Sequence, residues 1–235
     1  MVRATAVLFN QEVAMQKVLW SMFDGSGIMV KPWADAGYEC YCFNYEGANH
    51  GNYEPIRVKH ENIHYIDCWI DENFLSGEFV SVRPMPDVIF AFPDCTEFAG
   101  SGAKHRHTGL SSLRNAKMVE EIADAVGAKW MVENPVGKMS TLWRKPDHYF
   151  HPFEYGGYMT GKEESFHPRM PARDAYTKKT CLWVGGGFVM PEKKPVPHIG
   201  KFWGWAYLGG KSPKTKQLRS LTPRGFAQAV YLANR

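Results

Sequence analysis

Paired cysteines, long apolar runs and targeting segments are all missing from this sequence. Its five cysteines are scattered over 235 residues with no C-x-x-C pair, so neither a disulfide framework nor a structural zinc site is indicated. No apolar run reaches the ~18 residues that a membrane span needs. The N-terminus lacks a basic segment followed by an apolar core and a cleavage site. We therefore expect free thiols, no membrane association and a cytoplasmic location.

Composition and pattern indicate one α/β domain. Hydrophobic residues make up 44% of the chain and charged residues 22%, as in ordinary globular proteins. Apolar runs rich in strand-forming residues alternate with helical or turn segments, which is typical of a Rossmann-like, doubly wound and mostly parallel sheet. The expected strands are Val18–Phe23, Glu39–Phe43, Ile63–Asp67, Asp87–Phe92, Ala128–Val132 and Thr180–Val184.

Helices are expected after two of these strands and at the chain end. A short helix ends near Gly37, and an amphipathic crossover helix spans Leu113–Val126 and stops at Gly127. The last helix runs from Thr222, as its N-cap, to Asn234. Residues 135–173 and 191–213 show no regular period and are expected to be irregular. We divide the chain into a catalytic part (1–184), a basic and aromatic segment (185–221) and a C-terminal helix (222–235) that packs back on the catalytic part.

Cations and aromatic side chains are interleaved in the last third of the chain. This pattern suits a polyanion, and a solvated rim around buried aromatic residues is the alternative. The cations are Lys193, Lys194, Lys201, Lys211, Lys214, Lys216, Arg219 and Arg224, and the aromatic residues are Trp203, Trp205 and Tyr207.

The first expected strand runs into a glycine-rich turn, Phe23-Asp24-Gly25-Ser26-Gly27. Glycines let a ligand approach the backbone closely, and a following helix offers unpaired N–H groups. Acidic residues follow the next two strands: Glu46 is a candidate for binding ribose hydroxyls and Asp67 for a cofactor base. Many glycine-rich turns bind nothing, and exposed loop carboxylates are the alternative for both acids.

Two neighbouring strands are followed by a thiol and an acid. Cys95 comes after the strand Asp87–Phe92, and Glu133 ends the next one. Carboxyl ends of parallel strands share one edge of a sheet, so the two side chains are expected to meet there. Chemistry on a pyrimidine ring needs this pair: a thiolate attacks carbon 6, and a carboxyl group hydrogen-bonds to N3. A buried cysteine without a reactive role is the alternative.

The order of these motifs resembles that of the DNA cytosine-5 methyltransferases. Phe23–Gly27 is similar to the family's F-x-G-x-G loop, and Glu133-Asn134-Pro135 to its E-N-V motif. Pro93-Asp94-Cys95 with Phe98 is similar to P-P-C-x-x-F. Tyr176–Val184 stands in the place of the Q-x-R-x-R strand, and Leu221–Arg224 resembles the T-x-R-E helix.

The resemblance implies an S-adenosylmethionine-dependent enzyme that flips a cytosine out of DNA and methylates carbon 5 through an adduct with Cys95. Asn134 would hold Glu133, and Lys178 would contact the target nucleotide. No metal is implied. The cofactor-binding residues would be Phe23, Asp24, Gly25, Ser26, Gly27, Glu46, Asp67, Asp87 and Pro93. The DNA-binding residues would be Lys104, His105, Arg106, Lys214, Lys216, Arg219 and Arg224.

The sequence also departs from the family pattern. Asp94 is inserted before the cysteine, and Tyr176 and Thr180 replace the Gln and second Arg of Q-x-R-x-R. Only 37 residues separate Val184 from Thr222, where the family carries a large target-recognition domain. Recognition of the target sequence is therefore expected to be relaxed or delegated to a protein partner. Such compact members resemble those of phages and prophages.

Three alternatives remain. The enzyme could use another one-carbon donor or a free nucleotide, or the chain could be an inactive DNA-binding homologue. Cys95, His105 and His107 could instead bind zinc, although no second cysteine pair lies near them.

Overall fold

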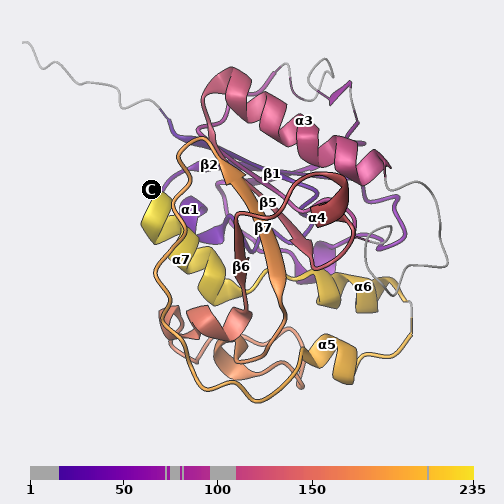
Figure 1. Ribbon diagram of the computed structural model, residues 1–235, viewed down its shortest axis with the longest axis vertical. Coiled ribbons are helices and arrows are strands. Elements are labelled where there is room, and N and C mark those ends of the chain that lie inside the picture. Colours follow the sequence, from indigo (N-terminus) through magenta and orange to yellow (C-terminus); the bar gives the residue numbers. More distant parts are fainter. Residues whose placement is uncertain (1–15, 72, 75–79, 81, 96–109, 211) are drawn as a thin grey trace, which may run out of the picture.

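The computed structural model describes residues 16–71, 73–74, 80, 82–95, 110–210 and 212–235. In this part of the chain, seven strands form one sheet in the order β3-β2-β1-β4-β5-β7-β6 (Figure 1). Strands β3, β2, β1, β4 and β5 are parallel to their neighbours, and β7 runs antiparallel to both β5 and β6. The strands are β1 (Val18–Met22), β2 (Glu39–Asn44), β3 (Ile63–Asp67), β4 (Val88–Ala91), β5 (Lys129–Pro135), β6 (His148–Phe150) and β7 (Thr180–Gly185).

This strand order with an antiparallel β7 is typical of the S-adenosylmethionine-dependent methyltransferase fold. The predicted Rossmann-like, mostly parallel sheet is thus confirmed, and all six predicted strands are present with shifts at their ends. Strand β6 was not predicted, because three residues are too few to show a period. It forms by pairing with β7, where Tyr149 lies opposite Cys181.

The three predicted helices are present with shifted ends, and the structure adds short helices that were not predicted, two of them inside residues 135–173 and 191–213, which we expected to be irregular. Helix α3 (Leu110–Val126) crosses from β4 to β5 and ends at Gly127, whose φ of 72° suits glycine. Helix α7 begins at Arg224, with Pro223 and not Thr222 at the N-cap position, and Thr222 is buried. The others are α1 (Lys31–Ala34), α4 (Met139–Leu142), α5 (Trp203–Ala206), α6 (Pro213–Ser220) and the 3₁₀ turns η1 (Glu54–Ile56), η4 (Pro152–Tyr158) and η5 (Ala172–Asp174).

The sheet separates two hydrophobic clusters. Alternation along β1 sends Trp20 to the face covered by α3 and Leu19 to the face covered by α1 and α7. Trp33 of α1 packs edge-on against Tyr231 of α7, with ring centroids 5.3 Å apart. A third cluster, around Phe202, joins α5 and α6 to the body of the protein. None of the helices in the described ranges is long and apolar enough to cross a membrane.

Candidate active site

The predicted functional residues gather where β1, β2, β3, β4 and β5 end. These strands are parallel, so their carboxyl ends share one edge of the sheet, where ligand sites of such folds lie. Three groups of side chains occur there: a glycine-rich loop after β1, acidic residues after β2 and β3, and a cavity beyond β4 and β5.

Asp24 organises the glycine-rich loop from its centre. Its Oδ1 accepts hydrogen bonds from the backbone N–H of Ser26 and of Gly27, at 2.9 and 2.8 Å, and from the Ser26 hydroxyl. Its Oδ2 accepts one from the Ser21 hydroxyl at 2.9 Å. Phe23, just before it, has a φ of 60°, which only a well-determined turn maintains in a residue other than glycine. Asp24 is buried, and its hydrogen bonds to Ser21, Ser26 and Gly27 hold the loop in shape.

Two tyrosines explain why this loop needs glycine. A Cβ at Gly25 would collide with the ring of Tyr53, and one at Gly27 would collide with the hydroxyl of Tyr65. The Tyr65 hydroxyl donates to the carbonyl of Val58 at 2.8 Å, which holds the ring beside the loop. We predicted that these glycines let a ligand approach the backbone closely. In the structure, the side chains of Tyr53 and Tyr65 occupy the space beside them.

The acidic residues after β2 and β3 lie together. The backbone N–H of Glu46 donates to Asp67 Oδ1 at 2.9 Å, and the Glu46 carboxylate forms an ion pair with Arg57. The Arg57 Nε in turn donates to the Gly25 carbonyl at 3.2 Å. Arg57, which the sequence did not single out, thus links the acidic residues to the glycine-rich loop.

The same edge carries groups suited to a nucleoside-like cofactor. Asn44 is buried, and its Nδ2 has no hydrogen-bond partner within the described ranges, so a donor is left over at the end of β2. Tyr45 and Trp69 are exposed and lie edge-to-face at 5.1 Å beside the acids. Carboxylates for hydroxyl groups, a spare amide donor and aromatic rings for a base fit S-adenosylmethionine.

Of the two remaining residues expected to bind the cofactor, Asp87 lies away from the site and Pro93 lies at it. Asp87 precedes β4 and lies at the opposite edge of the sheet, where its Oδ2 accepts a hydrogen bond from the Val18 N–H at 2.8 Å. The structure therefore removes Asp87 from the site. Pro93 does lie at the site, and its carbonyl accepts a hydrogen bond from Asn134 Nδ2 at 2.9 Å. Asn134 thus ties β5 to the loop that leads to Cys95, instead of holding Glu133.

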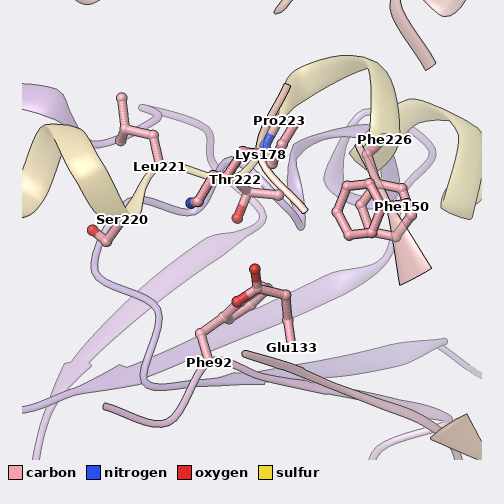
Figure 2. A pocket seen from close by; sticks show the side chains of 9 residues that line it. All are labelled: Phe92, Glu133, Phe150, Lys178, Ser220, Leu221, Thr222, Pro223 and Phe226. Atoms are coloured by element: carbon pink, nitrogen blue, oxygen red, sulfur yellow. The ribbon is translucent and has the colours of Figure 1, made fainter. Parts of the chain in front are cut away.

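A small cavity lies beyond β4 and β5, below the junction of α6 and α7 (Figure 2), with about 260 Å³ of empty space, part of which is open to solvent. The carboxyl group of Glu133 points into it, toward Lys178 and Thr222 on the opposite wall. Thr222, Ser220 and Phe150 come from parts of the chain that sequence reasoning did not assign to the site. The lining residues are Phe92, Glu133, Phe150, Lys178, Ser220, Leu221, Thr222, Pro223 and Phe226.

Cys95, Glu133 and Lys178 are close enough for their charges to interact. Burial raises the pKa of the Cys95 thiol most, the charges of Asp94 and Glu133 also raise it, and Lys178 lowers it; together these effects bring the pKa to about 11. Burial also raises the pKa of Glu133, and Lys178 again acts in the opposite direction. Lys178 is therefore the cation that favours the thiolate. Cys95 is half-buried, and the other four cysteines are buried.

Lys178 is held in place by the segment around α5 and α6. Its Nζ donates to the Arg219 carbonyl at 3.3 Å and lies 5.0 Å from the centroid of the Phe202 ring. An ammonium group placed over an aromatic face is stabilised by the ring quadrupole. Lys178 lines the cavity opposite Glu133, and its predicted contact with the target nucleotide or its phosphate stays a prediction.

Tyr53 connects the glycine-rich loop to the cavity. Its ring packs on Gly25, and its hydroxyl lies 2.8 Å from Ser220 Oγ, on the cavity wall. Gln217 strengthens this connection, since its Nε2 donates to the carbonyl of His50 at 2.7 Å. Tyr53 and Ser220 are 167 residues apart in the sequence, and no local pattern could have paired them.

Two arginines predicted to bind DNA have structural partners instead. Arg224 forms an ion pair with Asp174 at 2.9 Å, and Asp174 is fully buried. The Asp174 carboxylate also accepts a hydrogen bond from the Arg224 backbone N–H at 2.7 Å. Arg219 donates from Nε to the Gly204 carbonyl at 2.9 Å and from its guanidinium group to the Leu208 carbonyl. These arginines fasten α7 and α5.

The other predicted DNA-binding residues divide into two groups. Lys214 is exposed, and Lys216 donates to the Asn49 carbonyl at 3.1 Å. Lys104, His105 and Arg106 lie outside the described residues, as do Phe98 and His107. The zinc alternative falls there too. Among residues that the structure does describe, no three His, Cys, Asp or Glu side chains form a group that could hold a metal ion.

Comparison with known proteins gives distant structural likenesses. No protein-family model matches the chain, and no curated protein matches it. It is similar to a prophage-encoded E. coli protein assigned as a DNA modification methyltransferase (TM-score 0.43, 12% identity), over 72% of this chain and 46% of that one. It is also similar to an antibiotic-related methyltransferase (TM-score 0.37, 11% identity), over 72% of this chain and 87% of the other.

The chain spans about half the length of the E. coli protein. The strand order defines the fold, and the residues of the site are the basis for its function.

The surroundings of Cys95 lead to a labelling prediction. We expect iodoacetamide to modify Cys95 before the other cysteines, at a rate that rises about tenfold per pH unit between pH 7 and 10, since only the thiolate reacts and its pKa is about 11. Lys178→Gln should lower the rate several-fold at fixed pH, because it removes the cation that favours the thiolate. Peptide mass spectrometry measures both effects.

Lys179→Gln is the matched control for this experiment. Lys179 is exposed and lies over the Tyr149 ring, at 4.5 Å from its centroid. Its replacement should leave the labelling of Cys95 unchanged. An equal effect of the two variants, or a labelling rate independent of pH, would contradict the assignment.

Proposed function

We propose that this protein is an S-adenosylmethionine-dependent DNA methyltransferase that modifies carbon 5 of cytosine through a covalent adduct with Cys95. One observation carries the proposal: the half-buried Glu133 points its carboxyl group toward Lys178 across a cavity, and the charges of both act on the thiol of Cys95. A thiol and an acid whose charges interact are what addition to a pyrimidine ring requires.

The three residues divide the chemistry between them. The Cys95 thiol loses its proton to solvent, and its sulfur forms a bond to carbon 6 of a flipped-out cytosine. Glu133 donates a hydrogen bond to N3, where negative charge develops as the ring electrons move toward carbon 5. Lys178 stabilises the thiolate before the attack. S-adenosylmethionine, when bound, supplies the methyl group. Loss of the carbon 5 proton to solvent, with cleavage of the bond from sulfur to carbon 6, restores the ring and the thiolate.

The raised pKa values of the two groups have opposite consequences for these roles. A Glu133 carboxyl group that keeps its proton more readily than in water can donate to N3, as the reaction needs. The high pKa of Cys95 means that the thiolate is scarce in the free protein, so we expect attack to be efficient only once the substrate fills the cavity.

The cofactor would lie at the ends of β1, β2 and β3. Asp24 holds the loop after β1 in shape, and Glu46 and Asp67 would bind the hydroxyl groups and the base, respectively. Asn44 would use its unpaired Nδ2 as a donor. Tyr53 lies between this region and the cavity, through Gly25 on one side and Ser220 on the other.

DNA containing 5-fluorocytosine tests the proposal directly. The last step of the reaction removes a proton from carbon 5. Fluorine at this carbon replaces that hydrogen and cannot be removed by a base, so the adduct accumulates after methyl transfer. We expect the protein with S-adenosylmethionine to form a denaturation-resistant complex with this DNA, and Cys95→Ala to form none. Cys68→Ala, which changes a buried cysteine, is the control and should still form it.

The products distinguish the remaining alternatives. Mass spectrometry of cytosine-containing DNA should show a methyl group, whereas another added mass would indicate another one-carbon donor. Absence of any complex with the wild-type protein would contradict the covalent mechanism and favour a DNA-binding homologue. Because only a short segment connects β7 to α6, we also propose that sequence selectivity is relaxed or comes from a protein partner.

A further inference from the structure

We propose that Trp205 and Tyr207 form a stacking surface for the bases of an unpaired DNA strand, next to the cavity. The inference rests on the proposed function for its choice of DNA, and it adds the form in which the DNA is bound. Neither aromatic residue takes part in the chemistry described above.

Both side chains are unusually exposed for their size. Trp205 is 60% exposed and Tyr207 is 59% exposed, and both belong to the short segment around α5. The Trp205 ring rests edge-on against the buried Phe202 ring, with centroids 5.3 Å apart. The guanidinium group of the exposed Arg169 lies 5.1 Å from the centroid of the Tyr207 ring. Rings supported in this way lose little conformational freedom when a ligand stacks on them.

The charge of this part of the chain suits a nucleic acid. Residues 193–235 contain nine lysines and arginines and no acidic residue, whereas the remainder of the chain has more acidic than basic residues. Lys201 and Lys214, on either side of α5 in the sequence, are exposed. Exposed aromatic rings interleaved with cations are the elements that bind single strands: bases stack on the rings, and the cations follow the phosphates.

Contacts connect the stacking surface to the cavity. Trp205 touches Phe202, and the Phe202 ring lies under the ammonium group of Lys178, which lines the cavity. Arg219 provides a second connection, since its backbone carbonyl accepts from Lys178 and its side chain donates to Gly204 of α5. Figure 1 shows α5 beside α6, the helix whose end forms the cavity wall. The stacking surface and the cavity wall therefore share Phe202 and Arg219 as supports, and in this proposal a strand bound on the surface extends toward the cavity.

The aromatic faces select for unpaired bases. In a duplex, each base is stacked on both sides by its neighbours, so its face is not available to a protein ring. An unpaired strand offers these faces, and stacking on an aromatic side chain does not depend on the identity of the base. We therefore expect binding of single strands with little sequence preference, in agreement with the absence of a large recognition segment between β7 and α6.

Binding of fluorescently labelled oligo(dT) to the full chain, followed by anisotropy, tests this inference. Thymine-only DNA offers no cytosine for the chemistry, so the result is independent of the proposed reaction. We expect Trp205→Ala and Tyr207→Ala each to weaken binding about tenfold, and Trp205→Phe to retain most of it. Binding to a duplex should be weaker and should change little in these variants.

Tyr149→Ala is the matched control, because Tyr149 is also an exposed aromatic residue but belongs to β6. It should bind oligo(dT) like the wild type. Thermal unfolding shows whether each variant is folded. Unchanged oligo(dT) binding by folded Trp205→Ala and Tyr207→Ala would overturn the inference, and so would equal losses for duplex and single strand. Such results leave the trapping experiment unaffected, so the two proposals fail separately.

Discussion

Replacing Glu133 with Gln is expected to reduce methyl transfer by about 100- to 1,000-fold while stabilising the folded protein at neutral pH. The Gln amide has nearly the same shape but cannot supply an acidic proton to N3 of the cytosine, and loss of such a stabilising group has an effect of this size. The gain in stability follows because partial burial disfavours the charged form of the carboxyl group and raises its pKa.

The size of the stability effect of Glu133→Gln depends on pH. The folded pKa of Glu133 is raised, so below the unfolded pKa of about 4.5 the carboxyl group is neutral in both states and costs nothing. As the pH rises toward the folded pKa, the unfolded chain releases the proton more readily, and the native state loses stability. At pH 7.5, Glu133→Gln should therefore unfold at a higher urea concentration than the wild type. At pH 4, the two proteins should unfold at the same urea concentration.

Activity and urea unfolding, measured at both pH values, check this prediction. Glu121→Gln, at an exposed position of α3, is the control and should alter neither quantity appreciably. A Glu133→Gln protein that methylates DNA at the wild-type rate would remove Glu133 from the mechanism. A variant less stable than the wild type at pH 7.5 would show that the charged carboxylate is favoured in the cavity.

Replacing Arg224 with Met should destabilise the fold by about 3 to 5 kcal/mol, because it leaves the carboxyl group of Asp174 buried without its ion-pair partner. The loss should be partly restored in the double variant with Asp174→Asn, which removes the charge that Arg224 compensates. Urea unfolding of the single and double variants measures the coupling between the two residues.

Lys214→Met is the control for Arg224→Met, because both residues were predicted from their charge to bind DNA. Lys214 is exposed, so its replacement should change stability by less than about 0.5 kcal/mol. Equal stability of the Arg224→Met and wild-type proteins would mean that the ion pair does not support the position of α7, and the DNA-binding assignment of Arg224 would regain its basis.

The candidate site shows what strand order alone can predict. Cys95 and Glu133 were assigned from one rule, that parallel strands end at the same edge of a sheet, and their charges do interact in the structure. The same rule, applied to Asp87, places it at the opposite edge, because this residue precedes its strand. Its inclusion among the cofactor-binding residues came from the family resemblance and ignored that position.

Long-range partners were beyond the reach of sequence reasoning. The charge of Arg219 and Arg224 is visible in the sequence, but the carbonyl groups and the buried carboxylate that bind them are not. Tyr53 had no motif to mark it, because its role depends on contact with Gly25 and with Ser220. Strand β6 also depends on its partner, since three residues pair only where β7 is already in place.

The sequence by itself determined the alternation of strands and helices, the glycine-rich loop and the residues that follow each strand. These features depend on local periodicity and on the conformational preferences of neighbouring residues, which short stretches of sequence contain. Only the tertiary structure decided how the glycine-rich loop is packed, which cations are exposed, and how Cys95, Glu133 and Lys178 influence one another. Burial and charge act through space, so the pKa of the Cys95 thiol depends on residues from three separate parts of the chain.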